Sequence, residues 1–257
     1  MATFVLVPGA WLGGWAWRDV ADRLRARGHR VYPVTLTGLG ERVHLATPAV
    51  DLDTHVADVV NLLRFEDLFD AVLVGHSYAG EVVESAADRA PERIAQVVYV
   101  DSGPLGDGVA LLDTYSPQGQ QAVRREVATA GDGWRLPMPT WEDLSAQASL
   151  TGLGPAERAL IERHAVPHPF ATYTQPVRLT NPAAGAAMPK TAILNSFSEA
   201  DVRAALAAGV PMMRGLAGPN WRFIELPTGH WPMFSEPARL AATLERVGES
   251  RSREVEE

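Results

Sequence analysis

The sequence contains no cysteine, and this absence excludes several kinds of chemistry at once. Without thiols the chain forms no disulfide bond, carries no thiol nucleophile and offers no thiolate ligand to a metal ion. Lysine is almost as scarce, since Lys190 is the only one and arginines supply the remaining basic charge. The missing cysteine leaves the redox compartment of the protein undetermined.

Basic charge is also in deficit, because 23 lysine and arginine residues face 31 aspartate and glutamate residues and give a net charge of −8. Such a chain has no basic field to hold nucleic acid or an anionic lipid surface. Long apolar runs are missing too, and the apolar stretch at residues 1–7 lacks a basic leading segment and stops at Pro8-Gly9. We therefore expect a soluble cytoplasmic protein without nucleic-acid or membrane partners.

Apolar strand-like segments alternate with segments of helical periodicity over most of the 257 residues. Short β-branched or apolar runs predict strands, and apolar residues at i, i+3, i+4 and i+7 predict the helices between them. Such alternation is typical of an α/β fold, in which a mainly parallel sheet of about six strands is flanked by helices. The strands are expected at residues 3–7, 31–36, 71–74, 94–100, 191–194 and 221–226.

One serine stands where a predicted strand turns directly into a predicted helix. Ser77 lies in the sequence Gly75-His76-Ser77-Tyr78-Ala79, close to the G-x-S-x-G elbow that exposes a nucleophile at the end of a strand. Ala79 occupies the position where the second glycine is usual, and a methyl group is the smallest departure from that pattern. An ordinary helix N-cap is the alternative interpretation of Ser77.

Polar or glycine-rich residues also follow two other predicted strands. Pro8-Gly9-Ala10 comes after the first strand, and Asp101 comes after the strand that follows the elbow. The carboxyl ends of parallel strands meet at one edge of a sheet, and ligands bind there. We therefore expect these residues to share one rim with Ser77.

The alternation breaks between residues 104 and 186, where frequent prolines separate short helical pieces and aromatic residues are interspersed. No segment there favours a strand. We expect a mainly helical cap at 104–186 between two parts of the core, 1–103 and 187–248, with a charged flexible tail at 249–257. A second packing layer without contact to substrate is the alternative for the insertion.

These features, taken in chain order, resemble the α/β-hydrolase fold family. A glycine loop follows the first strand, the elbow follows a middle strand, an insertion comes next, and Gly229-His230 follows the last strand. The layout is similar to the compact branch of plant-type methyl esterases and hydroxynitrile lyases. The resemblance implies a triad of serine, acid and histidine, with Ser77 as nucleophile and His230 as general base.

Two places in the sequence compete for the acid of this triad. Most members of the family carry it after the penultimate strand, where Glu199 and Asp201 stand, although Asp201 also suits the cap of a following helix. Asp101 directly follows an apolar strand, and a carboxylate buried there is costly unless it is paired. Some relatives, notably haloalkane dehalogenases, place their acid at this position. We favour Asp101 and keep Asp201 and Glu199 open.

The resemblance also assigns the oxyanion hole, because the family uses two backbone N–H groups that correspond here to Ala10 and Tyr78. Trp11, Tyr78 and Trp231 are expected to line an apolar substrate pocket. His76 stands beside the nucleophile, but strand alternation points its side chain away from it.

Together these features predict a serine hydrolase, a carboxylesterase that cleaves a small hydrophobic ester through an acyl-enzyme. No motif indicates a cofactor or a metal site, and a homodimer is left open. One alternative is a non-hydrolytic, C–C bond lyase or tailoring enzyme on the same scaffold, and another is a small-molecule receptor. Hydroxynitrile lyases carry threonine and lysine where this chain has Ala10 and Trp231, which argues against a cyanohydrin lyase.

Overall fold

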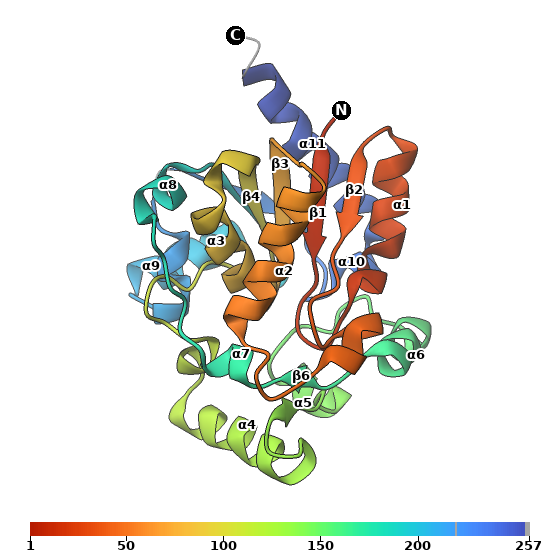
Figure 1. Cartoon of the computed structure of the whole chain (residues 1–257), viewed down its shortest axis with the longest axis vertical. Coiled ribbons are helices and arrows are strands. Elements are labelled where there is room, and N and C mark those ends of the chain that lie inside the picture. The colour runs from red at the N-terminus through yellow and green to blue at the C-terminus, as the bar shows by residue number, and fades with distance from the viewer. Residues whose placement is uncertain (219, 255–257) are drawn as a thin grey trace.

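The computed structural model describes residues 1–218 and 220–254. Its centre is a parallel sheet of six strands in the order β2-β1-β3-β4-β7-β8 (Figure 1). The α/β architecture expected from the sequence is confirmed. The strands are β1 (Thr3–Val7), β2 (Arg30–Pro33), β3 (Ala71–His76), β4 (Ile94–Val100), β7 (Lys190–Leu194) and β8 (Trp221–Glu225).

Helices cover both faces of this sheet (Figure 1). The pair α1 (Arg18–Ala26) and α11 (Pro237–Glu254) packs on one face, and the pair α2 (Leu52–Phe65) and α3 (Ala79–Arg89) packs on the other. Because successive strand residues point to opposite faces, Phe4 joins the apolar cluster of the first pair and its neighbour Val5 joins that of the second. The two clusters make the sheet a rigid support for the loops at its carboxyl edge.

The start of α2 and the end of β2 are each marked by a side-chain hydrogen bond. Asp51 caps α2, because its side chain accepts a hydrogen bond from the Thr54 amide in a capping box. β2 ends at Pro33, so the strand expected at 31–36 is shorter than predicted. Beyond it the chain leaves the sheet, and the Thr35 hydroxyl instead accepts a hydrogen bond from the Gly14 amide.

The segment expected to form a cap contains five helices, which are α4 (Pro117–Ala130), α5 (Trp141–Ser145), α6 (Pro155–His164), α7 (Ala171–Thr174) and α8 (Pro182–Ala187). Helices α4 to α7 lie beyond the carboxyl edge of the sheet, whereas α8 packs beside α3 (Figure 1). The expectation of no strand was wrong, because β5 (Arg135–Leu136) and β6 (His168–Pro169) pair as an antiparallel ribbon. The boundaries of the cap at 104 and 186 stay a prediction.

The remaining helices follow β7 and β8. α9 (Glu199–Ala207) comes after β7, and α10 (Pro232–Ser235) precedes α11. α11 continues to Glu254, so the first part of the tail expected to be flexible is helical, and residues 255–257 lie outside the described part. In the part of the chain that is described, no helix combines the length and the apolar character needed to cross a membrane.

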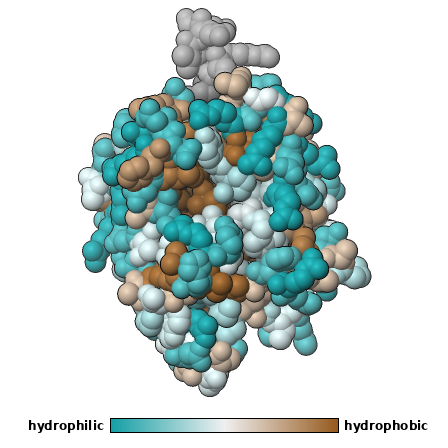
Figure 2. All heavy atoms as spheres, turned by 45° about the vertical axis from the view of Figure 1, so that its right-hand side comes forward, coloured by the Kyte–Doolittle hydropathy of each residue, from teal (hydrophilic) through white to brown (hydrophobic). Residues whose placement is uncertain are grey.

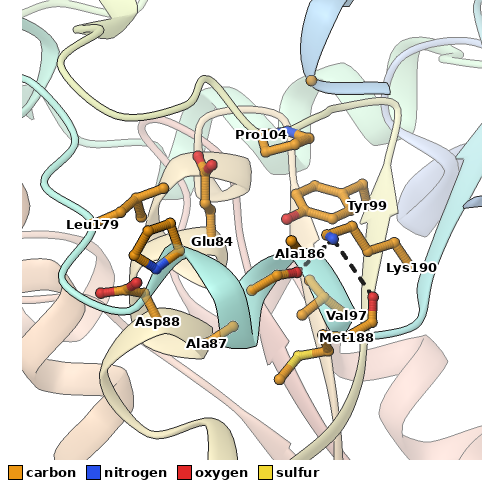
Figure 3. A pocket seen from close by; sticks show the side chains of 13 residues that line it. Glu84, Ala87, Asp88, Val97, Tyr99, Pro104, Leu179, Ala186, Met188 and Lys190 are labelled. Atoms are coloured by element: carbon orange, nitrogen blue, oxygen red, sulfur yellow. Dashed lines mark hydrogen bonds between the residues drawn. The ribbon is translucent and has the colours of Figure 1, made fainter. Parts of the chain in front are cut away.

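A cavity of about 160 Å³ lies where α3, β4, β7 and α8 meet, away from the triad residues predicted above (Figure 3). Glu84 and Lys190 both line it. The Glu84 carboxylate accepts hydrogen bonds from the amides of Leu105 and Gly106, where the chain leaves the core for the cap. Burial raises the pKa of Glu84 to about 7. The Lys190 ammonium donates to the Gly185 carbonyl at 2.6 Å, which ties β7 to α8.

Glu81, one turn earlier on α3, is buried with both carboxylate oxygens lacking a hydrogen-bond partner in the described structure. Burial, together with the nearby charge of Glu84, raises the pKa of Glu81 well above its usual value. The raised pKa favours the protonated form of this carboxyl group, whose polar atoms still lack partners. We therefore expect Glu81 to destabilise the fold.

We expect Glu81→Met, which keeps the volume and removes the acid, to raise the free energy of unfolding at pH 8 by about 1–3 kcal/mol. A raised pKa in the folded state means that the folded protein binds more protons than the unfolded chain, so stability falls as pH rises above the unfolded pKa of about 4.3. Urea unfolding at pH 5 and pH 8 measures this pH dependence. The free energy of unfolding is expected to decrease less between pH 5 and pH 8 in Glu81→Met than in the wild type.

Glu126 on α4 is exposed and serves as the matched control, since Glu126→Met is expected to change stability by less than about 0.5 kcal/mol. A Glu81→Met protein that is less stable than the wild type at pH 8, or that keeps the same decline between the two pH values, contradicts this interpretation.

Candidate active site

Ser77 occupies a strained turn between β3 and α3. Its φ angle is +53°, in the left-handed region that residues other than glycine rarely adopt. The turn is tight enough that a Cβ atom on Gly75 would lie 2.8 Å from the Ala79 carbonyl oxygen, and one on Gly80 would collide with the Ser102 hydroxyl. The small residues of the motif are therefore required by the close approach of strand and helix.

The backbone of Ser77 is held on both sides. Its amide donates to the Val100 carbonyl at 3.2 Å, and its carbonyl accepts a hydrogen bond from the Ser102 hydroxyl at 2.6 Å. Tyr78, and not Ser77, is the residue that precedes the first turn of α3. The Ser77 side chain is thus left free of capping and faces the edge of the sheet.

A continuous path of hydrogen bonds runs from Ser77 through His230 to Asp101. His230 Nε2 lies 2.9 Å from Ser77 Oγ, and His230 Nδ1 lies 2.7 Å from Asp101 Oδ2. Because the carboxylate only accepts, Nδ1–H donates to it and Nε2 accepts the serine proton. The geometry matches what a general base next to a serine nucleophile requires.

Asp101 is well supplied with donors besides His230. Its side chain is 2% exposed, and it accepts hydrogen bonds from the amides of Asn195 and Ser196 and from the Ser196 hydroxyl at 2.7 Å. Burial by itself favours the neutral acid, but the hydrogen bond and charge of His230 and the bonds from Ser196 together hold the pKa of Asp101 below its usual value. The group remains a carboxylate.

The two alternative acids, Asp201 and Glu199, bind other partners. The Asp201 side chain is exposed and accepts hydrogen bonds from the amide and hydroxyl of Ser198, which is the N-cap residue of α9. Glu199 pairs with Arg203 one turn along the same helix. Of the three candidates, the structure brings only Asp101 to His230.

His76 has a contact that the sequence did not reveal. Its side chain is turned from the Ser77 hydroxyl toward the base, where its Nε2–H donates to the His230 carbonyl at 2.7 Å. Burial, with the adjacent charge of His230, lowers the pKa of His76 to about 3, so the ring is neutral. His76 therefore supports the backbone of His230 and does not compete as a base.

The loop after β1 passes directly over the elbow. A Cβ atom on Gly9 would lie 2.8 Å from His76 Nδ1 and 3.0 Å from Ser77 Cβ, so only glycine fits at this point. Among the described residues, the amides of Ala10 and Tyr78 donate to no protein acceptor. Both segments are thus adjacent to Ser77 and carry unused donors.

The three aromatic residues expected in the pocket have different surroundings. The Trp231 ring meets the His230 ring edge to face at 4.8 Å. The Trp11 indole donates to the Leu136 carbonyl, which fixes it to the cap. Tyr78 is buried within an apolar cluster, but its hydroxyl lies 2.7 Å from His55 Nδ1. Sequence alternation did not anticipate this polar contact.

The arrangement is suited to attack by a serine oxygen with transfer of its proton to an imidazole. A base, an orienting carboxylate and two backbone donors lie around one hydroxyl. Within the described residues, no group of three or more His, Asp or Glu side chains is placed to hold a metal ion.

Among curated proteins, the chain is similar to several that are named as esterases or hydrolases. A carbendazim hydrolyzing esterase of Nocardioides sp. is 35% identical over a match that covers 96% of this chain and 100% of the relative. A pyrethroid hydrolase of Sphingobium wenxiniae is 28% identical over 93% of this chain and 85% of its own. Methylesterase 8 of Arabidopsis thaliana is 35% identical over a shorter stretch, 38% of this chain and 37% of its own.

Solved structures agree on the fold. An extracellular alpha/beta-hydrolase from a Paenibacillus species superposes with a TM-score of 0.80 at 22% identity, over 96% of this chain and 99% of that one. The profile of the Alpha/beta hydrolase family matches residues 4–243, which include Ser77, Asp101 and His230. The chain therefore belongs to the alpha/beta hydrolase family.

Proposed function

We propose that this carboxylic ester hydrolase cleaves small, apolar esters through an acyl-enzyme formed on Ser77. Its full-length esterase relative supports the reaction class. The observation that supports the residue roles is the unbroken hydrogen-bonded path Ser77–His230–Asp101 at the carboxyl edge of the sheet. The substrate class and the roles of the residues are the parts that are proposed.

In the proposed reaction, Ser77 Oγ attacks the ester carbonyl while His230 Nε2 takes its proton. Asp101 stabilises the imidazolium and keeps the ring in the tautomer that accepts from serine. The Ala10 and Tyr78 amides stabilise the negative charge that develops on the carbonyl oxygen. His230 then returns the proton to the departing alcohol, and a water molecule activated by the same base releases the acid.

Apolar surroundings support a neutral, hydrophobic substrate. The Trp231 ring packs against the His230 ring, Trp11 directly follows Ala10, and brown apolar residues gather on the surface at the height of the cap in Figure 2. The similar proteins are named as a methylesterase, a pyrethroid hydrolase and a carbendazim hydrolyzing esterase. We propose that the alcohol portion accepted by this chain is small, as in a methyl ester.

The sequence also raised two alternative functions, a cytoplasmic location and the question of a homodimer. The two relatives matched over most of their length are named as an esterase and a hydrolase, which favours ester hydrolysis over a lyase reaction and over a receptor without activity. A cytoplasmic location and a homodimer stay predictions.

The role of Asp101 is tested by comparing two matched substitutions. Asp101→Asn is expected to lower kcat for p-nitrophenyl acetate by about 10³–10⁴, because the amide favours the wrong imidazole tautomer. Asp201→Asn removes only a helix-capping contact and is expected to stay within about threefold of wild type. Stopped-flow and steady-state assays on both folded variants measure kcat. A larger loss of kcat in Asp201→Asn than in Asp101→Asn would identify Asp201 as the triad acid instead.

The substrate class is tested with methyl, butyl and tert-butyl esters of one aromatic acid, with Ser77→Ala as the inactive background. We expect kcat/KM to fall at least about tenfold from methyl to tert-butyl, since a bulkier alcohol must fit against Trp231 and His230. Equal rates for all three esters would contradict a small alcohol site, and a Ser77→Ala protein that still hydrolyses them would contradict the nucleophile.

A further inference from the structure

Trp11 adopts a backbone conformation that a bulky residue avoids. Its φ angle is +64°, and it directly follows Ala10, one of the two residues assigned to the oxyanion hole. Such strain persists only where the surrounding structure holds the residue in place. The contacts that hold Trp11 therefore also fix the direction of the neighbouring Ala10 amide.

Three hydrogen bonds hold Trp11, and all of them come from the cap. Its amide donates to His168 Nδ1 at 3.3 Å, its carbonyl accepts from the Val166 amide at 3.1 Å, and its indole donates to the Leu136 carbonyl at 3.0 Å. Leu136 and His168 are paired with each other across the β5–β6 ribbon. The ribbon thus acts as a clamp on the loop after β1.

His168 is the only one of these three partners that uses a side chain. The ring is fully buried, and its Nε2–H donates to the Thr172 hydroxyl at 3.0 Å, which in turn donates to the Pro169 carbonyl. Because Thr172 fixes the proton on Nε2, Nδ1 is left as an acceptor for the Trp11 amide. Burial, with the charge of nearby His55, lowers the pKa of His168 well below its usual value and keeps the ring neutral.

The same ring also contacts the second oxyanion residue. The His168 and Tyr78 rings meet edge to face at 4.5 Å, and the Tyr173 ring packs against both, parallel to Tyr78 at 5.8 Å. The Tyr78 hydroxyl donates to His55 Nδ1, whose other nitrogen donates to the Thr37 carbonyl. His168 therefore lies between the two segments that supply the backbone donors.

We propose that His168 is a positioning residue for the oxyanion hole. Its Nδ1 accepts a hydrogen bond from the Trp11 amide and thereby keeps the Ala10 N–H aimed at the carbonyl oxygen of the substrate. This inference rests on the function proposed above. Loss of the acceptor leaves the partly buried Trp11 amide without a partner, and the strained loop relaxes. The chemistry at Ser77 and His230 is unchanged, so the loss falls on the transition state and spares substrate binding.

The test compares His168→Leu with His168→Gln, whose side-chain oxygen and NH₂ group offer the same acceptor and donor. We expect His168→Leu to lower kcat about 10- to 100-fold, below the effect of removing a whole oxyanion donor, with KM within about threefold. In His168→Leu, the affinity for an aryl trifluoromethyl ketone, whose adduct carries an oxyanion, is expected to fall by the same factor as kcat/KM. His168→Gln is expected to recover most of the inhibitor affinity and most of kcat/KM.

His164→Leu is the matched control, because among the described residues this cap histidine hydrogen-bonds only the Leu160 carbonyl of its own helix, and it packs on Trp15. It is expected to keep kcat and inhibitor affinity within about threefold of wild type. Active-site titration with a fluorophosphonate corrects every rate for the fraction of folded enzyme. Should His168→Leu fail to fold, Thr172→Val removes the acceptor of Nε2–H and is expected to show a smaller loss of the same kind.

A purely structural role predicts a lower folded fraction with a normal rate per titrated site. That result, a rise in KM alone, or inhibitor affinity that does not follow kcat/KM would overturn the proposal. Failure of the fluorophosphonate to label Ser77 in the wild type would instead overturn the proposed function.

Discussion

A negative charge buried at the end of β4 is the constraint around which the site is arranged. Such a charge is stable only when it is paired and hydrogen-bonded. Asp101 obtains its partners from Asn195 and Ser196 after β7 and from His230 after β8. Because β3, β4, β7 and β8 are consecutive in the sheet, satisfying this one carboxylate also sets the base beside Ser77 at the end of β3.

Patterns that are local in sequence predicted the fold and the nucleophile. Alternating apolar runs located the strands. The crowding at Gly75 and Gly80 requires small residues there, and this requirement makes the elbow recognisable from the sequence. The choice of acid was not local, since Asp201 suits a helix cap as well as a triad, and only the folded chain places Ser196 on Asp101. The roles of His76 and His168 depend on partners 154 and 157 residues away, which no short pattern records.

The cap holds the reacting groups as well as covering them. Its Ser149 and Thr151 carbonyls accept hydrogen bonds from the amides of His230 and Gly229, at 2.8 and 3.0 Å. On the other side, the β5–β6 ribbon holds Trp11 beside Ala10. In the proposed mechanism the base and the oxyanion donors are thus both held by the same insertion, so substitutions in the cap are expected to alter reaction rate as well as substrate choice.

The central claim is that the acyl group of an ester becomes attached to Ser77 during turnover. The most direct measurement is peptide mapping by mass spectrometry after a slowly deacylating aryl ester is mixed with the enzyme and quenched in acid. The account predicts a mass increase equal to the acyl group on the peptide that contains Ser77, and none in Ser77→Ala. An adduct on another residue, or turnover with no acyl adduct at any quench time, would contradict it.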